Sequence, residues 1–272
     1  MAADLGRILF PVDFSNRCVL AARHVKTWAE KLSAALNTLH VVDLEDFGYS
    51  DQRDYNVISD LIVRRTADLK YFADHYLGEN VAHHTVVKGD TRAQIESFAR
   101  QEKVDLIMLP RNHQSIGSRL LRDSLTATIL DKSTASLWIT EHVEAINKLS
   151  VDRILCAVHF ERDLMLDSQN SRILQKVLAL AKAFRAEVTC LSVIDEEEET
   201  TRRPADASSS SGIEPWLIQA REQFGNAAEF LRQKGDVVST IADITNQKAA
   251  DLVVASVVMP KPSQTVTPPA GG

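Results

Sequence analysis

Residues 7–14 read RILFPVDF and residues 153–160 read RILCAVHF, so one pattern occurs twice at a displacement of 146 residues. After its first residue, the stretch 7–12 is apolar without alternation. Such a run is typical of a strand that is buried on both faces of a parallel sheet. The two stretches therefore predict the same buried strand in two parts of the chain.

Two further motifs keep this register. Residues 88–90 read KGD and recur at 234–236, and residues 104–107 read VDLI and recur as ADLV at 250–253. Matches at one displacement indicate a duplicated domain, because the period is far longer than that of solenoid repeats. We place the boundary between the copies in the segment 141–150.

The first copy alternates between strand and helix patterns. Ser15 is a candidate N-cap for a helix whose apolar face carries Val25, Trp28, Ala29 and Leu32. We expect further strands at 37–42, 82–88, 106–109 and 135–140, and helices at 57–76, 92–102 and 117–132. The predicted fold class is therefore α/β, with a doubly wound, mostly parallel five-stranded sheet and right-handed crossovers.

The second copy is shorter than the first. A run of acidic residues followed by serines at 208–211 is too polar to bury a core, so we expect a disordered loop there. We expect a helix around 215–233, a shortened or missing counterpart of the strand 82–88, and a strand at 252–256. Only 13 residues follow Met259, several of them proline, which leaves no room for a last helix and strand.

The composition is that of a folded protein, with 44% hydrophobic and 25% charged residues. The formal net charge is −6 and no run of Lys or Arg exceeds two residues, which argues against nucleic acid as a partner. We expect no membrane association and a cytoplasmic location, because long apolar stretches and the features of a signal peptide are absent. Cys18, Cys156 and Cys190 show no Cys-x-x-Cys spacing, so neither a disulfide framework nor a thiolate metal site is expected.

Five short motifs, taken together, are similar to a known family. They are ILFPVDFS at 8–15, LHVVD at 39–43, GD at 89–90, VDLIM at 104–108 and SRLLRDS at 118–124. In this order and spacing the chain resembles a tandem universal stress protein, over nearly all of residues 5–141. The resemblance implies an adenine nucleotide alpha hydrolase-like fold. It also implies a family in which some members bind ATP and others do not.

The resemblance places a nucleotide cleft at the carboxyl ends of the parallel strands, where loops and helix N-termini converge. In nucleotide-binding members the positions of Asp13 and Val41 hold adenine and ribose, and glycines after the fourth strand cradle the phosphates. The candidate ATP-binding residues of the first domain are Pro11, Val12, Asp13, Val41, Met108, Arg111 and Ser124.

This sequence departs from the family pattern in the phosphate loop. The pattern Gly-x-x-Gly, about nine residues, then Gly-Ser is matched here by Leu109 and Asn112 and then by Asp123, so the three glycines are replaced. Asp123 puts a carboxylate where phosphate oxygens would lie, although Arg111 and neighbouring basic residues offer side-chain contacts instead. In the second copy His159 stands at the position of Asp13.

The resulting domain organisation is a complete universal stress protein-like domain at 1–145, a degenerate one at 146–260 and a disordered tail at 261–272. The second domain is expected to lack the phosphate loop, the last helix and the last strand. The preferred hypothesis is a non-enzymatic stress-response protein that acts as a regulatory or interaction module and requires no cofactor. The alternative is an adenine-nucleotide sensor that binds ATP in the first domain.

The last strand of the first copy suggests how the chain associates. In the family this strand is typically the dimer contact, and here the second copy supplies no equivalent. An uncovered apolar edge is an aggregation hazard that proteins normally cover. We therefore expect a homodimer through Leu137, Trp138 and Ile139, or alternatively pairing of this edge with residues 265–267 of the tail. A different protein partner is the remaining possibility.

Overall fold

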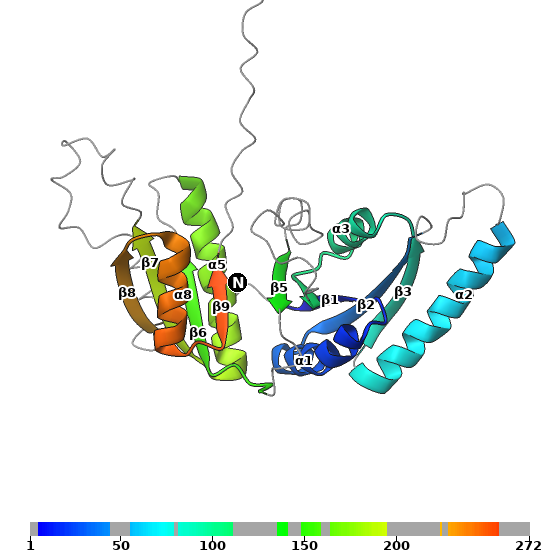
Figure 1. Ribbon diagram of the computed structural model, residues 1–272, viewed down its shortest axis with the longest axis horizontal. Coiled ribbons are helices and arrows are strands. Elements are labelled where there is room, and N and C mark those ends of the chain that lie inside the picture. The colour runs from blue at the N-terminus through cyan, green and yellow to red at the C-terminus, as the bar shows by residue number, and fades with distance from the viewer. Residues whose placement is uncertain are drawn as a thin grey trace, which may run out of the picture.

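The structure is a computed structural model, shown in Figure 1. It describes residues 5–43, 55–78, 81–110, 135–140, 148–158, 164–194, 224 and 228–255. Several sequence-based expectations lie outside these residues. They are the helix at 117–132, the loop around 208–211, the tail at 261–272, and Arg111, Asn112, Asp123, Ser124 and His159.

The first half of the chain contains a five-stranded parallel sheet, as predicted. Its strands are β1 (Arg7–Pro11), β2 (Ala35–Val42), β3 (Val81–Lys88), β4 (Leu106–Pro110) and β5 (Ser136–Thr140), in the spatial order β3-β2-β1-β4-β5. The order reverses beside β1, so β1 and β4 flank the switch point at which doubly wound sheets bind ligands.

Helices cover both faces of this sheet (Figure 1). They are α1 (Asn16–Leu32), α2 (Tyr55–Phe72), its π-helical continuation η2 (Ala73–Leu77) and α3 (Thr91–Gln101). Helices α1 and α2 pack on one face and α3 on the other. The Ser15 hydroxyl accepts the Cys18 N–H at 3.4 Å, which confirms the predicted N-cap of α1.

The second half contains a four-stranded parallel sheet. Its strands are β6 (Arg153–Val158), β7 (Glu187–Ile194), β8 (Ala228–Lys234) and β9 (Leu252–Ala255), in the order β8-β7-β6-β9. The helices described are α5 (Leu164–Phe184) and α8 (Val237–Lys248). The second copy is thus the same fold in shorter form, as predicted.

Two sequence-based expectations are wrong in the described part of this segment. Residues 228–233 were expected to end a helix around 215–233 but form strand β8, so the counterpart of the strand 82–88 is present. Among residues 215–227 the structure describes Phe224, which is helical. β8 pairs with β7 along its whole length of 7 residues. Its sequence AEFLRQK is rich in residues that favour helices, so pairing across the sheet overrides the local preference.

The repeated Asp of the VDLI and ADLV motifs ties two strands together at their starts. Asp105 Oδ2 accepts the Arg7 N–H at 3.0 Å. In the second half Asp251 Oδ2 accepts the Arg153 N–H at 3.0 Å. The same contact therefore joins β1 to β4 and β6 to β9, which makes this repeated residue a scaffold residue.

The repeated KGD motif also serves the scaffold. Asp90 Oδ1 accepts the Ala93 N–H at 2.8 Å, and Asp236 Oδ1 accepts the Ser239 N–H at 2.8 Å. These contacts cap α3 and α8, each of which begins one residue after its aspartate. The motif thus satisfies a backbone donor that the first helical turn leaves unpaired.

The two halves share one apolar cluster. Trp28 of α1 lies with its ring centroid 5.2 Å from Phe184 of α5 and 6.1 Å from Trp138 of β5. All three side chains are buried. At the edge of this contact Lys176 Nζ of α5 donates to Ser136 Oγ at 2.7 Å. The second half is therefore packed against α1 and β5 of the first.

Candidate functional site

The carboxyl ends of β1 and β2 bring two of the candidate residues to one edge of the sheet. Pro11 lies opposite Leu39 in the parallel register, and the Val12 N–H donates to the Leu39 oxygen at 2.8 Å. Continuing this register by two residues puts Asp13 beside Val41. This is the edge at which the sequence predicts a nucleotide cleft.

Alternation along the strands divides the candidate residues between the two faces. Val41 packs with the apolar cluster under α3, whereas Val12 and Met108 belong to the cluster under α1 and α2. Met108 is fully buried at 0% exposure and Val12 at 3%. Met108 is therefore a core residue on the face of the sheet that α1 and α2 cover. Val12 is buried on the same face, so its backbone rather than its side chain is available to a ligand at this edge.

Asp13 is exposed at the turn between β1 and α1. Its Oδ1 accepts the Ser15 N–H at 2.8 Å, and the intervening Phe14 adopts a left-handed conformation with φ 61°. Partial burial raises the pKa of Asp13, but hydrogen bonds from Cys18 and Ser15 outweigh it, so the pKa lies below its ordinary value. The side chain is a carboxylate at neutral pH and also shapes the turn.

Cys18 lies directly beneath Asp13 and is not a nucleophile. Its Sγ donates to the Pro11 oxygen at 3.8 Å. Burial, and then the negative charge of Asp13, raise the pKa of the thiol to about 12. The thiolate that nucleophilic chemistry requires is therefore not formed near neutral pH.

Leu109 occupies the end of β4 at the position of the first family glycine. It is 8% exposed and belongs to the apolar cluster of Leu39 and Ile107, against which Val41 packs. A glycine at this position would leave the backbone open to a phosphate group. The leucine side chain instead packs into the buried cluster that Val41 also contacts.

A second group at this edge was not predicted from the sequence. His40 Nδ1 lies 2.7 Å from the Val12 oxygen, and its ring centroid lies 4.6 Å from that of Phe14. The Arg65 guanidinium of α2 lies over the Phe14 ring, 5.6 Å from its centroid. Strand alternation places His40 on the face covered by α1 and α2, but the sequence has no signal for its hydrogen bond to Val12, 28 positions away.

A family model for the universal stress protein family matches residues 5–141 and residues 151–257. The chain belongs to this family. The two matched segments confirm the tandem arrangement suggested by the repeats.

Solved structures share the fold across both halves of the chain. A universal stress protein from Archaeoglobus fulgidus has a TM-score of 0.65 and 16% identity, over 93% of this chain and 85% of that one. A putative universal stress protein from Pseudomonas aeruginosa has a TM-score of 0.60 and 14% identity, over 97% and 86%. A protein of unknown function from the same species has a TM-score of 0.59 and 13% identity, over 96% and 84%. At these identities the likeness concerns the fold.

No curated protein matches the chain. Within the part of the chain that the structure describes, no helix is long and apolar enough to cross a membrane, and no group of three or more His, Cys, Asp or Glu side chains is placed to hold a metal ion.

Proposed function

We propose that this universal stress protein is a non-enzymatic regulatory or interaction module whose first-domain nucleotide cleft is degenerate. The observation that carries the proposal is the burial of Leu109 in the apolar cluster beside Val41. A bound nucleotide needs the space and the backbone donors that a glycine leaves open there. The protonated Cys18 thiol agrees with a role other than nucleophilic catalysis.

The second candidate function is an adenine-nucleotide sensor in the first domain. The specific observation in its favour is Asp13, an exposed carboxylate beside Val41 at the switch-point edge of the sheet. A carboxylate there is able to accept hydrogen bonds from ribose or from the adenine amino group.

Thermal unfolding with millimolar Mg-ATP, AMP or adenosine distinguishes the two candidates, after bound nucleotide has been excluded in the purified protein. A ligand at a hundred times its Kd adds about 2.7 kcal/mol and raises the Tm by roughly 5–10 °C. We expect no rise, because a buried leucine stands where nucleotide-binding members have the first glycine of the phosphate loop.

If the Tm does rise with ATP, a matched pair of variants tests whether Asp13 is responsible. A rise with ATP that disappears in Asp13→Ala but persists in Asp60→Ala would contradict the degenerate cleft and establish the sensor. Asp60 is the suitable control because it is an exposed carboxylate on α2 that is not among the candidate nucleotide-binding residues.

We further propose that two chains associate through the part of β5 around Ile139, which stays exposed beside the packed second half. Within the described residues β5 pairs with β4 alone. Trp138 is 9% exposed and packs within the chain, whereas Ile139 is 37% exposed. Ile139 is therefore the member of the predicted trio that offers apolar surface to a second copy.

Sedimentation velocity tests the association. We expect the wild-type protein to be a dimer at micromolar concentrations and Ile139→Lys to be a monomer, because the variant puts a charge into the apolar contact. Val63→Lys is the matched control, because Val63 is 66% exposed on α2. Helix α2 packs on β2 and β3, and β3 lies at the opposite end of the sheet from β5. A wild-type protein that stays monomeric over this range would contradict the β5 contact.

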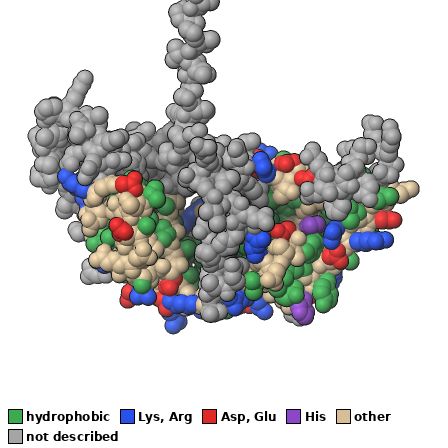
Figure 2. Space-filling model, viewed as in Figure 1, with side chains coloured by type: hydrophobic (Ala, Val, Ile, Leu, Met, Phe, Trp, Pro, Cys, Tyr) green, Lys and Arg blue, Asp and Glu red, His purple; other side chains and the backbone are tan. Residues whose placement is uncertain are grey.

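The surface charges and the cysteines bear on the class of partner and on the location of the protein. On the face drawn in Figure 2, acidic and basic side chains of the described residues are interspersed, which gives no support to a nucleic-acid surface. The three cysteines are free and buried. A cytoplasmic setting, in which thiols stay reduced, suits them and forms part of the proposal.

A further inference from the structure

Helix α2 covers two partly buried histidines of the sheet. His40 of β2 and His84 of β3 lie on the same face as Thr38, by the alternation of strand residues. On this face α2 packs against β2 and β3, and its own residues Leu69 and Phe72 are buried. The hydrogen bonds and charges around each ring show what protonation would do.

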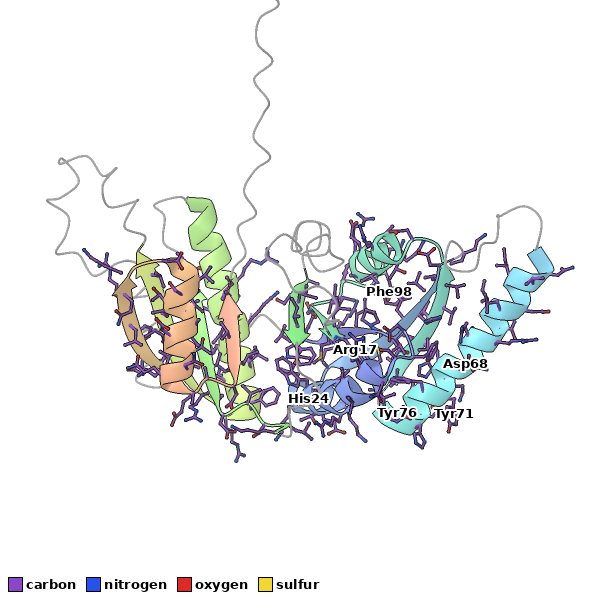
Figure 3. The ribbon with its side chains drawn as sticks, viewed as in Figure 1. Arg17, His24, Asp68, Tyr71, Tyr76 and Phe98 are labelled. Carbon is purple, nitrogen blue, oxygen red and sulfur yellow. The ribbon has the colours of Figure 1, made fainter. Side chains whose placement is uncertain are left out.

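His40 already uses one of its ring nitrogens. Its Nδ1–H donates to the Val12 oxygen at 2.7 Å, which leaves Nε2 as the atom that takes up a proton. The charged groups that face the ring are Arg65 and Asp68 of α2 and Asp13 of the turn after β1. Figure 3 shows Asp68 on the length of α2 beside the sheet.

His84 has a similar arrangement one strand further out. Its Nδ1 lies 3.0 Å from Thr38 Oγ1, and the Thr38 hydroxyl donates to the His83 oxygen at 3.4 Å. Thr38 Oγ1 therefore accepts from Nδ1, and Nε2 is again the basic atom. The charged or titratable groups that face this ring are Lys70 of α2, Asp74 of η2 and His83 of the same strand.

The sum of these surroundings opposes a charge on either ring. Burial is the largest cause that lowers the pKa of His40, and Arg65 adds to it, whereas the Val12 carbonyl, Asp13 and Asp68 act in the opposite direction. Burial likewise lowers the pKa of His84, with Lys70 and His83 adding to it and Asp74 opposing it. The packed arrangement of α2 therefore favours neutral rings.

The direction of the pH effect follows from linkage. When α2 is detached, both rings are hydrated and titrate near the ordinary histidine value of about 6.5. Because the packed state has the lower pKa, its stabilisation is complete above about pH 6.5 and is lost as the pH falls below it. The detached state binds more protons in this range.

We propose that α2 is an acid-sensitive cover, which protonation of His40 and His84 releases from strands β2 and β3. The central strands β1 and β4 carry neither histidine and stay paired. Release exposes Leu69 and Phe72, which are buried in the packed state. Acid thereby converts a closed face of the first domain into an apolar surface.

Amide hydrogen exchange measured by mass spectrometry at pH 7.5 and pH 5.5 tests the proposal on the full chain. After correction for the intrinsic pH dependence of exchange, we expect amides of residues 55–77 to exchange several-fold faster at pH 5.5 than at pH 7.5, because the detached state binds more protons. Amides of β1 and β4 should keep their protection.

Non-titrating variants provide the control. In His40→Asn and His84→Asn, singly and together, the amide N–H can replace the Nδ1–H donor while the basic nitrogen is removed. The double variant should lose the acid-induced increase, and His83→Asn, an exposed neighbour of His84, should keep it. Unchanged exchange of α2 in the wild-type protein overturns the proposal, as does an equal increase in the double variant.

Discussion

Replacing Trp28 with alanine should lower the free energy of unfolding by about 3–5 kcal/mol, the range for deleting a large buried aromatic side chain. Trp28 is 3% exposed and contacts Phe184 and Trp138 at once, so its loss leaves a cavity between the two halves. Urea unfolding followed by circular dichroism measures the change. We also expect the single transition to split, because the halves lose much of the contact that couples them.

Tyr71 provides the matched control for this variant. It is an aromatic residue on α2, but it is 69% exposed and its ring stacks on that of His75. Tyr71→Ala should change the stability by no more than about 0.5 kcal/mol, as is usual for exposed positions. A Trp28→Ala variant as stable as Tyr71→Ala would show that the shared cluster contributes little in solution.

Replacing Gly89 with alanine should destabilise the protein by about 1–3 kcal/mol, the cost of a backbone conformation that side chains rarely adopt. Gly89 has φ 130°, and a Cβ atom there would lie 3.0 Å from Gln94 Nε2. Gly235 repeats the situation in the second half with φ 137° and a Cβ position 3.2 Å from Thr240 Oγ1. The Tm of Gly89→Ala and Gly235→Ala measures both costs.

A double variant separates backbone strain from crowding. Gln94→Ala removes the contacting side chain, so Gly89→Ala combined with Gln94→Ala should recover only the crowding part of the loss. Full recovery would mean that the positive φ costs nothing. No loss in either glycine variant would mean that the KGD turn relaxes into another conformation.

Much of the fold could be predicted because the sequence repeats its scaffold. The apolar run 7–12, the Ser15 cap and the two KGD motifs each reflect a local requirement, namely burial on two faces, a helix start and a tight turn. Strand β8 was missed because the requirement there is not local. Its residues favour a helix in isolation, and only the neighbouring strand β7 makes them extended.

The candidate site was predictable in position and less so in detail. The switch point of the sheet identifies the edge that holds Asp13 and Val41. Strand alternation places Met108 in the buried cluster under α1 and α2, on the opposite face of the sheet from Val41. The contact between His40, Phe14 and Arg65 depends on how α2 crosses the sheet, and no spacing in the sequence encodes that crossing.

The shared cluster of Trp28, Trp138 and Phe184 has a consequence for how strongly the halves need to bind each other. Two domains joined by a short linker meet at an effective concentration in the millimolar range. An interface with a dissociation constant far weaker than that of a stable two-chain complex therefore stays closed within one chain. The covalent connection therefore adds to the contacts of the shared cluster in keeping the second half against the first.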